Sequence, residues 1–396
     1  MISKTAYLNA SGFALIAVCY GFARFAFGLF LPAIDDELSL SASISGVISA
    51  GAFFGYCVAI LLAAYLAERM SPRSLAVLAA LVASTGMLAI SLAQTPLSLA
   101  LAVLFAGSST GLASPPMAAA VKMAVATRQQ ASSNTCINAG TGVGVALSGP
   151  LALLLGADWR IAFMLLAGVA LLVSLACYCY LPAKRPSPNQ AELEQQPWLT
   201  SASRRLISAS LLMGAASTAI WSFGGELVRQ QLDWGANGSA LLWSLVGASG
   251  LLGASAGSLI VHYGLNRIHR LSLVALAAAI VAIGCYGYWP WLMIAGGALF
   301  GAAYIMLTGV YLVWGVNALP ERPASGLMIG FLTMAIGQTL GAALFGILLE
   351  HYNSALVCIS FALLALNATL IASPLTGVSV LTNAAKPAAT MRDSEH

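Results

Sequence analysis

The stretch Tyr20–Pro32 reads Tyr-Gly-Phe-Ala-Arg-Phe-Ala-Phe-Gly-Leu-Phe-Leu-Pro and lies inside the first long apolar segment of the chain. Its one charged side chain is Arg24, and no other Asp, Glu, Lys, Arg or His lies between Lys4 and Asp35. Because arginine stays protonated, exposing it to lipid costs about 3 kcal/mol or more. A rise of about 1.5 Å per residue places Arg24 roughly 16 Å from Asp35, near the middle or outer half of a bilayer core. The rest of the chain must therefore supply a polar interior that receives Arg24.

The composition places the whole chain in the membrane class. Charged residues make up 8% of the sequence and the AVILMFWYC set 60%, against about a quarter and about a half in soluble domains. The net charge of +4 is small and spread over loops, so no basic patch indicates nucleic-acid binding. All seven cysteines lie in apolar segments without CxxC spacing, which indicates packing residues rather than metal or redox sites. The first apolar run continues to Leu31, which is too long for a signal peptide.

Twelve apolar segments are long enough to span a bilayer. They cover residues 7–31, 43–66, 74–94, 98–121, 132–156, 160–181, 206–230, 238–261, 270–289, 291–317, 325–349 and 354–374. We therefore expect an all-α integral membrane protein with 12 transmembrane helices in two six-helix bundles, 1–182 and 206–378. The polar stretch 183–205 would link the bundles, and 379–396 would form a polar tail.

Lysine and arginine are distributed unevenly over the expected loops. If both termini are cytoplasmic, fourteen of the 17 basic residues face the cytoplasm, whereas Arg160 and Arg229 alone face outside and Arg24 lies in the membrane. Basic residues are retained on the cytoplasmic side of membrane proteins. We therefore expect a multi-pass protein of the cell inner membrane, with both termini and the linker in the cytoplasm.

The two halves of the chain repeat each other. Ala64 matches Gly257, Gly144 matches Gly337, and Trp159 matches Tyr352, each 193 positions further on. A six-plus-six layout with a repeat of this kind is typical of one large group of transporters.

A loop motif carries the resemblance to that group. The loop after segment 43–66 reads Ala64-Tyr-Leu-Ala-Glu68-Arg69-Met-Ser71-Pro-Arg73. It resembles the Gly-x-Leu-x-Asp-Arg-x-Gly-Arg-Arg signature of the major facilitator superfamily, with three departures, at Ala64, Glu68 and Ser71. The resemblance implies alternating access between two halves, and a cytoplasmic latch of Glu68, Arg69 and Arg73 that stabilises the outward-open state. The retention of basic residues in the cytoplasm alone also explains the two arginines.

The second copy of this loop runs from Gly257 to Gly264 and has Val261 where the signature has an acid. The resemblance therefore implies a latch from the first copy only.

Two further stretches bear on the direction of transport. Tyr20–Pro32, continued to Asp36 and Ser41, resembles a bacterial branch described as sugar-efflux-like or cyanate-permease-like, which implies export. Residues 140–150 are similar to an antiporter signature of spaced glycines ending in Gly-Pro, although the spacing from Gly144 to Gly149 is one residue too long. Close helix packing explains the same glycines, and we favour that interpretation.

In this superfamily helices 1, 4, 7 and 10 line the central cavity, and the corresponding segments carry polar stripes. The candidate substrate contacts are Tyr20, Arg24, Phe27, Asn138, Ser222, Glu226, Tyr304, Thr308, Tyr311 and Gln338. Aromatic side chains with hydroxyl tips suit a small organic ligand in a wet cavity. The alternatives are packing roles for the tyrosines and interhelical hydrogen bonds for Gln338 and Asn138.

Glu226 and Asp35 are the candidate proton carriers. Glu226 lies 21 positions after Arg205, as Arg24 lies 20 after Lys4, so we expect Glu226 and Arg24 at similar depth across the cavity. The alternative is that Glu226 pairs with Arg229 at the outer interface. Arg24 would then be held by an anionic substrate or by helix carbonyl groups.

We predict a secondary active transporter for a small organic molecule, coupled to protons and favouring export, with no cofactor and a monomeric state. The alternative within transport is an uptake symporter or exchanger for an organic anion that pairs with Arg24. An enzyme is not expected, because His262, His269, His351 and His396 are placed in loops or the tail and the helices hold no metal or nucleophile constellation. The sequence has no Gly-x-x-x-x-Gly-Lys loop for ATP, and a sensor is disfavoured because no soluble domain is attached.

Overall fold

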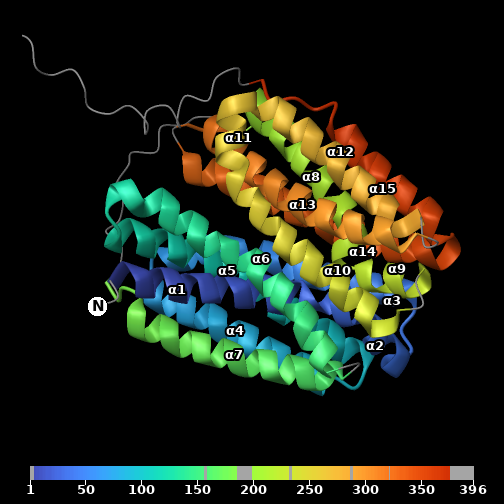
Figure 1. Cartoon of the computed structure of the whole chain (residues 1–396). Helices are drawn as coiled ribbons and strands as arrows, with labels where there is room; N and C mark the ends of the chain where they lie inside the picture. The colour runs from blue at the N-terminus through green and yellow to red at the C-terminus, as the bar shows by residue number, and fades with distance from the viewer. Residues whose placement is uncertain are drawn as a thin grey trace, which may run out of the picture.

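The structure, a computed structural model, describes residues 4–155, 158–184, 199–231, 234–285, 289–320 and 322–374. All regular elements over these residues are helices (Figure 1). Nine helices among them are long and apolar enough to cross a membrane, or up to eleven if each of two bent pairs is one span. The expected linker and tail fall largely outside the described residues, at 185–198 and 375–396.

The first half of the chain contains six helical units that match the first six expected segments. The first unit consists of α1 (Lys4–Ile16), the π-helix η1 (Ala17–Arg24) and α2 (Ala26–Leu38). The other five are α3 (Ala42–Ala67), α4 (Pro72–Leu92), α5 (Pro96–Ala124), α6 (Thr127–Leu155) and α7 (Trp159–Tyr180). The side chains of Ser41, Ser71 and Thr95 accept a backbone hydrogen bond from the third residue that follows, which caps these helices where they begin.

The second half contains units that match the other six segments, and two of them are bent. The seventh consists of α8 (Ser201–Trp221) and α9 (Gly224–Gln231), which meet at 47°. The eighth consists of α10 (Gly235–Gly250), η2 (Leu251–Ser255) and α11 (Ala256–Tyr263), with a bend of 51°. The remaining helices are α12 (Leu265–Cys285), α13 (Pro290–Ala318), α14 (Pro323–His351) and α15 (Ser354–Ala368). Helix α15 is apolar but shorter than a full span.

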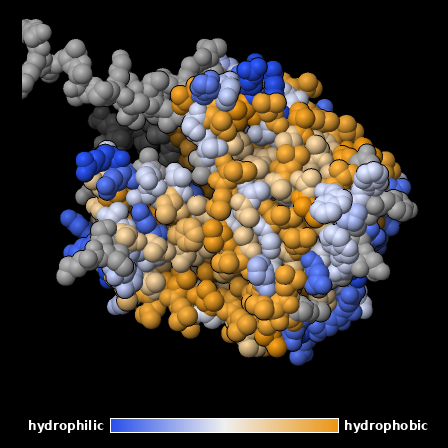
Figure 2. All heavy atoms as spheres, in the orientation of Figure 1, coloured by the Kyte–Doolittle hydropathy of each residue, from blue (hydrophilic) through white to orange (hydrophobic). Residues whose placement is uncertain are grey.

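The two ends of the helix bundle differ in charge. We call the end that carries Asp35, Asp36 and Glu37 the acidic end, and the end that carries Lys4 and Arg73 the basic end. Figure 1 shows the N-terminus at one end of the bundle and α2 at the other. Figure 2 shows hydrophobic residues across the middle of the visible face and hydrophilic residues toward its two ends. A belt of exposed apolar side chains between two polar ends is what contact with a bilayer requires.

The two halves are joined from mid-depth to the acidic end. There α3 packs on α14, α6 on α10, and α2 on α9. A Cβ atom on Gly28 would overlap the carbonyl oxygen of Trp221, and one on Gly46 would overlap the backbone of Ala342. Contacts this close, backbone against backbone, require glycine. Toward the basic end the two halves diverge in Figure 1.

Hydrogen bonds cross between the halves at several depths. They join Arg24 to Gln338, the Trp243 indole to the Phe25 carbonyl, Ser49 to Ser222, the Ser43 amide to Glu350, and Arg229 to Asp36. Arg24 and Gln338 lie near the middle of their spans, whereas Asp36 and Glu350 lie at the ends of theirs. These hydrogen bonds show that the two halves are in contact from the middle of the bundle to its acidic end.

Candidate functional site

Arg24 is placed by an irregularity in the first helical unit. It is the last residue of the π-helix η1, and the Phe25 amide donates to the Tyr20 carbonyl at 3.2 Å. A π-helix rotates the residues that follow it, and π-turns inside helices occur frequently at functional sites. Gly21 in η1 lies directly on the backbone of Gly144 in α6. Arg24 is thereby turned into the protein and is 6% exposed.

The hydrogen-bond partner of Arg24 comes from the other half. Its Nη2 donates to Oε1 of Gln338 on α14 at 2.5 Å. Gln338 is fully buried, and its Nε2 donates to the Tyr304 hydroxyl at 3.0 Å and to the Ser217 hydroxyl at 3.4 Å. Because Tyr304 on α13 and Ser217 on α8 accept from the amide nitrogen of Gln338, its amide oxygen points at the guanidinium of Arg24.

Aromatic rings surround the guanidinium of Arg24. Its Cζ lies 4.5 Å from the ring centroid of Tyr56, 4.9 Å from Phe53, 5.1 Å from Phe25 and 5.8 Å from Tyr20. Ring faces within about 6 Å of a cation attract it.

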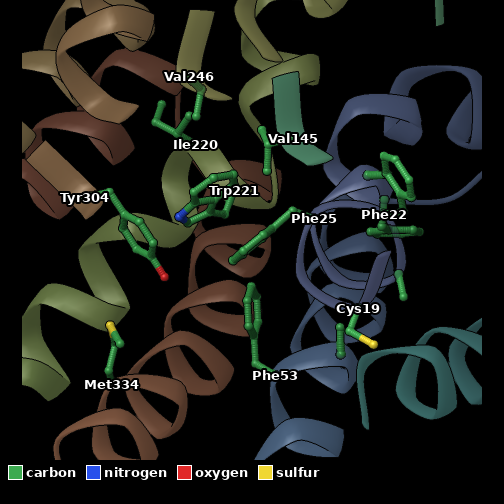
Figure 3. Packing of buried hydrophobic residues seen from close by; sticks show 14 of the residues in the cluster. Cys19, Phe22, Phe25, Phe53, Val145, Ile220, Trp221, Val246, Tyr304 and Met334 are labelled. Atoms are coloured by element: carbon green, nitrogen blue, oxygen red, sulfur yellow. The ribbon is translucent and has the colours of Figure 1, made fainter. Parts of the chain in front are cut away.

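These rings continue into the second half. Trp221 stacks on Phe25 with a centroid distance of 3.9 Å and meets Tyr304 edge-on at 5.0 Å. Figure 3 shows Trp221 between Tyr304 and Phe25, with Phe53 beside Phe25. The aromatic layer therefore crosses the junction of the two halves at the depth of Arg24.

No carboxylate compensates Arg24 in the described part of the chain. None of the ion pairs found there includes it, and its Nε has no hydrogen-bond partner among these residues. The buried Nε1 of Trp221 likewise has none among them. The site is thus ring-lined and rich in donors, with one positive charge that no described acid neutralises.

Glu226 lies at the acidic end, where it pairs with Arg229. The Glu226 carboxylate accepts from Nε of Arg229 and from Nε2 of Gln230, both at 2.8 Å, and Arg229 also bonds Asp36 at 2.6 Å. The expected similar depth of Glu226 and Arg24 is therefore wrong. The expectation counted residues from Lys4 and from Arg205 along helices assumed to be straight. The first unit instead contains the π-helix η1, and a bend separates α8 from α9.

A pocket of about 240 Å³ lies at the acidic end, lined by residues of both halves. Its lining residues are Asp35, Asp36, Leu40, Ala42, Phe223, Glu226, Arg229, Gln230 and Leu349. Asp35 accepts from the Ser45 hydroxyl at 2.8 Å. The two candidate proton carriers, Asp35 and Glu226, thus share one pocket, and this pocket is separate from the Arg24 site.

The remaining candidate contacts divide between the site and other places. The Tyr20 hydroxyl lies 2.9 Å from that of Ser114, beside Arg24. The Ser222 hydroxyl accepts from Ser49 at 2.6 Å, and Thr308 donates to the carbonyl of Ile305 within its own helix. Phe27 is buried, and Asn138 is exposed. The structure therefore brings Tyr20, Arg24, Tyr304 and Gln338 together.

Tyr311 belongs to a second buried cluster. Its hydroxyl donates to the Ala209 carbonyl at 3.1 Å and lies 3.2 Å from Nε2 of His269, whose ring also meets the edge of Trp314. His269 is fully buried inside α12. The expectation that it lies in a loop is wrong, because α12 begins at Leu265, five residues earlier than the apolar pattern indicated.

The three latch residues contact only the first half among the described residues. Arg69 lies 3.9 Å from Glu68 and stacks 3.5 Å over the ring of Tyr65. Arg73 donates to the Leu181 carbonyl at 2.8 Å. This arrangement neither joins the halves nor contradicts a latch in another conformation.

The glycines of α6 serve close packing. Cβ atoms on Gly140 and Gly144 would overlap the carbonyl oxygens of Phe13 and Ala17 in the first helical unit. Gly142 and Gly149 face α10 of the other half, at Gly247 and Ala240 respectively. Packing accounts for all four positions, in agreement with the interpretation that we favour from the sequence.

Sequence reasoning missed Phe53, Tyr56, Ser217 and Trp221. Phe53 and Tyr56 lie on α3, outside the helices taken as cavity-lining. Ser217 lies five residues before Ser222, on a different face of the expected helix. Trp221 directly precedes the candidate contact Ser222, but its indole was not counted among the polar side chains of that helix.

A family model described as Major Facilitator Superfamily matches residues 13–342. The chain belongs to the major facilitator superfamily. It is therefore a multi-pass membrane transporter and not an enzyme. A comparison with curated proteins found no significant match.

Solved structures of three transporters are similar to the chain. The nucleoside transporter NupG, in the crystal structure of a mutant, is 15% identical with a TM-score of 0.78, covering 93% of this chain and 98% of that one. The xylose transporter XylE from E. coli, partially occluded and inward open, is 14% identical with a TM-score of 0.73, covering 93% and 97%. A bacterial homolog of the human lysosomal transporter Spinster, inward-facing and occupied, is 15% identical with a TM-score of 0.67, covering 97% and 96%. At these identities the likeness shows the fold alone.

Proposed function

We propose that this member of the superfamily moves a small organic molecule across the inner membrane by alternating access, as a monomer coupled to protons. The observation that carries the proposal is the Arg24–Gln338 hydrogen bond at the junction of the halves. A buried polar pair between two bodies that separate during transport is suited to bind a ligand and to sense its presence. The proposed site consists of Tyr20, Arg24, Tyr304 and Gln338 with the rings of Tyr56 and Trp221.

Binding and transport can be tested directly. We expect the purified protein to gain thermal stability with its substrate, because a ligand that binds only the folded state raises apparent stability. A thermal-shift screen against metabolites would identify compounds, and proteoliposomes would then show flux of those that bind. Binders that never cross the membrane under any imposed gradient would contradict the proposal.

The basic end is proposed to face the cytoplasm, which makes this conformation inward-facing. A reporter that is active only outside the cytoplasm should give no signal when fused at residue 190. The matched control is a fusion after Ser39, at the acidic end, which should be active because positive charges are retained inside. A strong signal at residue 190 would overturn the orientation.

Proton coupling is proposed to use Glu226 first and Asp35 second. Protonation of Glu226 would weaken its bond to Arg229, which also holds Asp36 of the other half. A proton gradient can drive transport only through an acid whose proton affinity changes between conformations. We therefore expect Glu226→Gln to flatten the pH dependence of transport while substrate exchange continues.

The control for this variant is Glu37→Gln, since Glu37 pairs with Arg160 and Trp159 within the first half. Its pH dependence should match that of the wild type. Proton-driven transport that is unchanged in Glu226→Gln would remove this residue from the mechanism.

Export is the favoured direction, supported by the resemblance of Tyr20–Pro32 to efflux-like sequences. The second candidate function is uptake or exchange of an organic anion, which is supported by the absence of a carboxylate partner for Arg24 among the described residues. Flux measured in right-side-out and inside-out vesicles would distinguish the two directions. The latch of Glu68, Arg69 and Arg73 is proposed to act in the outward-open state.

A further inference from the structure

We infer that the substrate is an organic monoanion with a flat apolar body, and that the amide oxygen of Gln338 takes the place of one oxygen of its anionic group when the site is empty. The inference rests on the proposed transport function and adds the class of substrate. It is carried by the uncompensated charge of Arg24, by the Nε donor that has no partner among the described residues, and by the surrounding rings.

The first argument is charge. The helices that contact Arg24 or hold its partner are α3, α8, α13 and α14, and none has an Asp, Glu, Lys, Arg or His at its depth. The sequence shows no such residue in 38–67, 206–225, 271–320 or 323–349. A buried charge without a counterion is unfavourable. A neutral substrate would leave the charge of Arg24 unbalanced and a cation would add repulsion, whereas a single negative charge balances it.

The second argument is geometry. The Nε and Nη2 groups of an arginine point their hydrogens along the same edge, where a carboxylate can accept both in parallel. In Arg24 the Nη2 donates to the Gln338 oxygen while Nε has no partner among the described residues. The Gln338 oxygen is thus one neutral acceptor for a guanidinium that can bind a two-oxygen anion through its Nε and Nη2 groups.

Gln338 is held in this orientation by other residues. Its nitrogen donates to Tyr304 and Ser217, so the amide is not free to turn away, and its oxygen is presented to Arg24. An amide and a carboxylate have the same planar shape, and the oxygen of Gln338 is thus a neutral counterpart of a carboxylate oxygen.

The third argument concerns the body of the substrate. Flat ring faces of Phe25, Phe53, Tyr56 and Trp221 lie around or beside the guanidinium. Such faces favour an aromatic or unsaturated body by stacking and apolar contact. Together with the charge argument, they point to an aromatic monocarboxylate.

The exchange would also link occupancy to movement. Arg24 belongs to the first half and Gln338 to the second, and their hydrogen bond crosses between them. When the anion replaces the Gln338 oxygen, the substrate itself becomes part of the junction. The contact between the halves then differs in free energy with and without substrate. Such a difference is what allows a ligand to shift a conformational equilibrium.

The test compares benzoate, phenylacetate and 4-hydroxybenzoate with their neutral amides, on the full-length protein in detergent and in proteoliposomes. The acids should bind at least about tenfold more tightly than the amides in thermal-shift titrations, because charge-assisted bidentate hydrogen bonds are stronger than neutral ones. Equal binding of acid and amide, or no binding of any acid, would overturn the inference.

Two variants of Gln338 test whether its oxygen replaces a substrate oxygen at Arg24, which we call the stand-in role, or whether the residue only stabilises the fold. Gln338→Glu places a permanent carboxylate beside Arg24, so benzoate binding should weaken about tenfold or more while the melting temperature rises. Gln338→Leu removes the competing oxygen, so benzoate binding should tighten by about threefold or more although the melting temperature falls. Equal loss of binding in both variants, or benzoate binding by Gln338→Glu like that of the wild type, would contradict the stand-in role.

The outcomes for this inference and for the proposed function are distinct. If only the amides bind and cross the membrane, the substrate charge is wrong and the transport function stands. If the acids bind with the expected variant effects but never cross under any gradient, the site is as inferred and the transport function is wrong.

Discussion

Transport by Arg24→Ala is expected to fall about 100-fold, because losing one partner of a charged, bidentate interaction costs about 3 kcal/mol. The fold should survive. Removing a buried charge relieves an unfavourable burial, whereas the Gln338 oxygen loses its donor at a cost of about 1–3 kcal/mol. Flux into proteoliposomes, together with the melting temperature of the purified variant, measures the two effects separately.

Further variants identify the partner of Arg24. Arg24→Lys should recover only part of the flux, since lysine cannot offer two parallel donors. Arg24→Ala combined with Glu226→Gln should show additive effects, because Glu226 is bonded to Arg229 and not to Arg24. The matched control is Arg270→Ala, an exposed arginine on α12 whose replacement should leave flux within about twofold. Transport by Arg24→Ala like that of the wild type would leave Arg24 as a packing residue bonded to Gln338.

Closure at the acidic end is expected to fail in Gly28→Val. The new side chain would meet the Trp221 carbonyl and the Trp243 ring, and Gly225 of α9 packs on the carbonyl of Gly28 from the other half. Overpacking costs about 1–3 kcal/mol, and here only the conformation in which α2 and α9 touch bears it. Since about 1.4 kcal/mol changes an equilibrium tenfold, we expect transport to fall by about 10- to 100-fold.

The shift in conformation can be observed at Ser49, which is buried beside Ser222 in the closed arrangement. On a background without the native cysteines, Ser49→Cys should be protected from a membrane-impermeant maleimide added at the acidic end. The same cysteine should become reactive when Gly28→Val is present. Gly168→Val is the matched control, because a Cβ on Gly168 meets no atom within 4 Å. Protection of Ser49→Cys that Gly28→Val does not change would show that this glycine contact does not hold the acidic end closed.

The sequence alone predicted the membrane class, the helical segments and the superfamily. These follow from properties counted along the chain: the length of apolar runs, the position of basic residues and the motif around Glu68–Arg73. The expected segment boundaries differ from those of the helices by a few residues, and the deviation at Leu265 was enough to misplace His269. The family model covering residues 13–342 confirms the superfamily.

The importance of Arg24 was also evident from the sequence, because a charged side chain in an apolar segment needs a polar partner inside the protein. The tertiary structure decided which residue is that partner. Gln338 lies 314 positions away along the chain, and the carboxylate that counting placed opposite, Glu226, belongs to the acidic end. The depth of Arg24 and the direction of its side chain depend on the π-helix at Ala17–Arg24, and those of Glu226 depend on the bend after Trp221. Both irregularities rotate the residues that follow them, so a count along straight helices does not give the depth or the facing of a side chain.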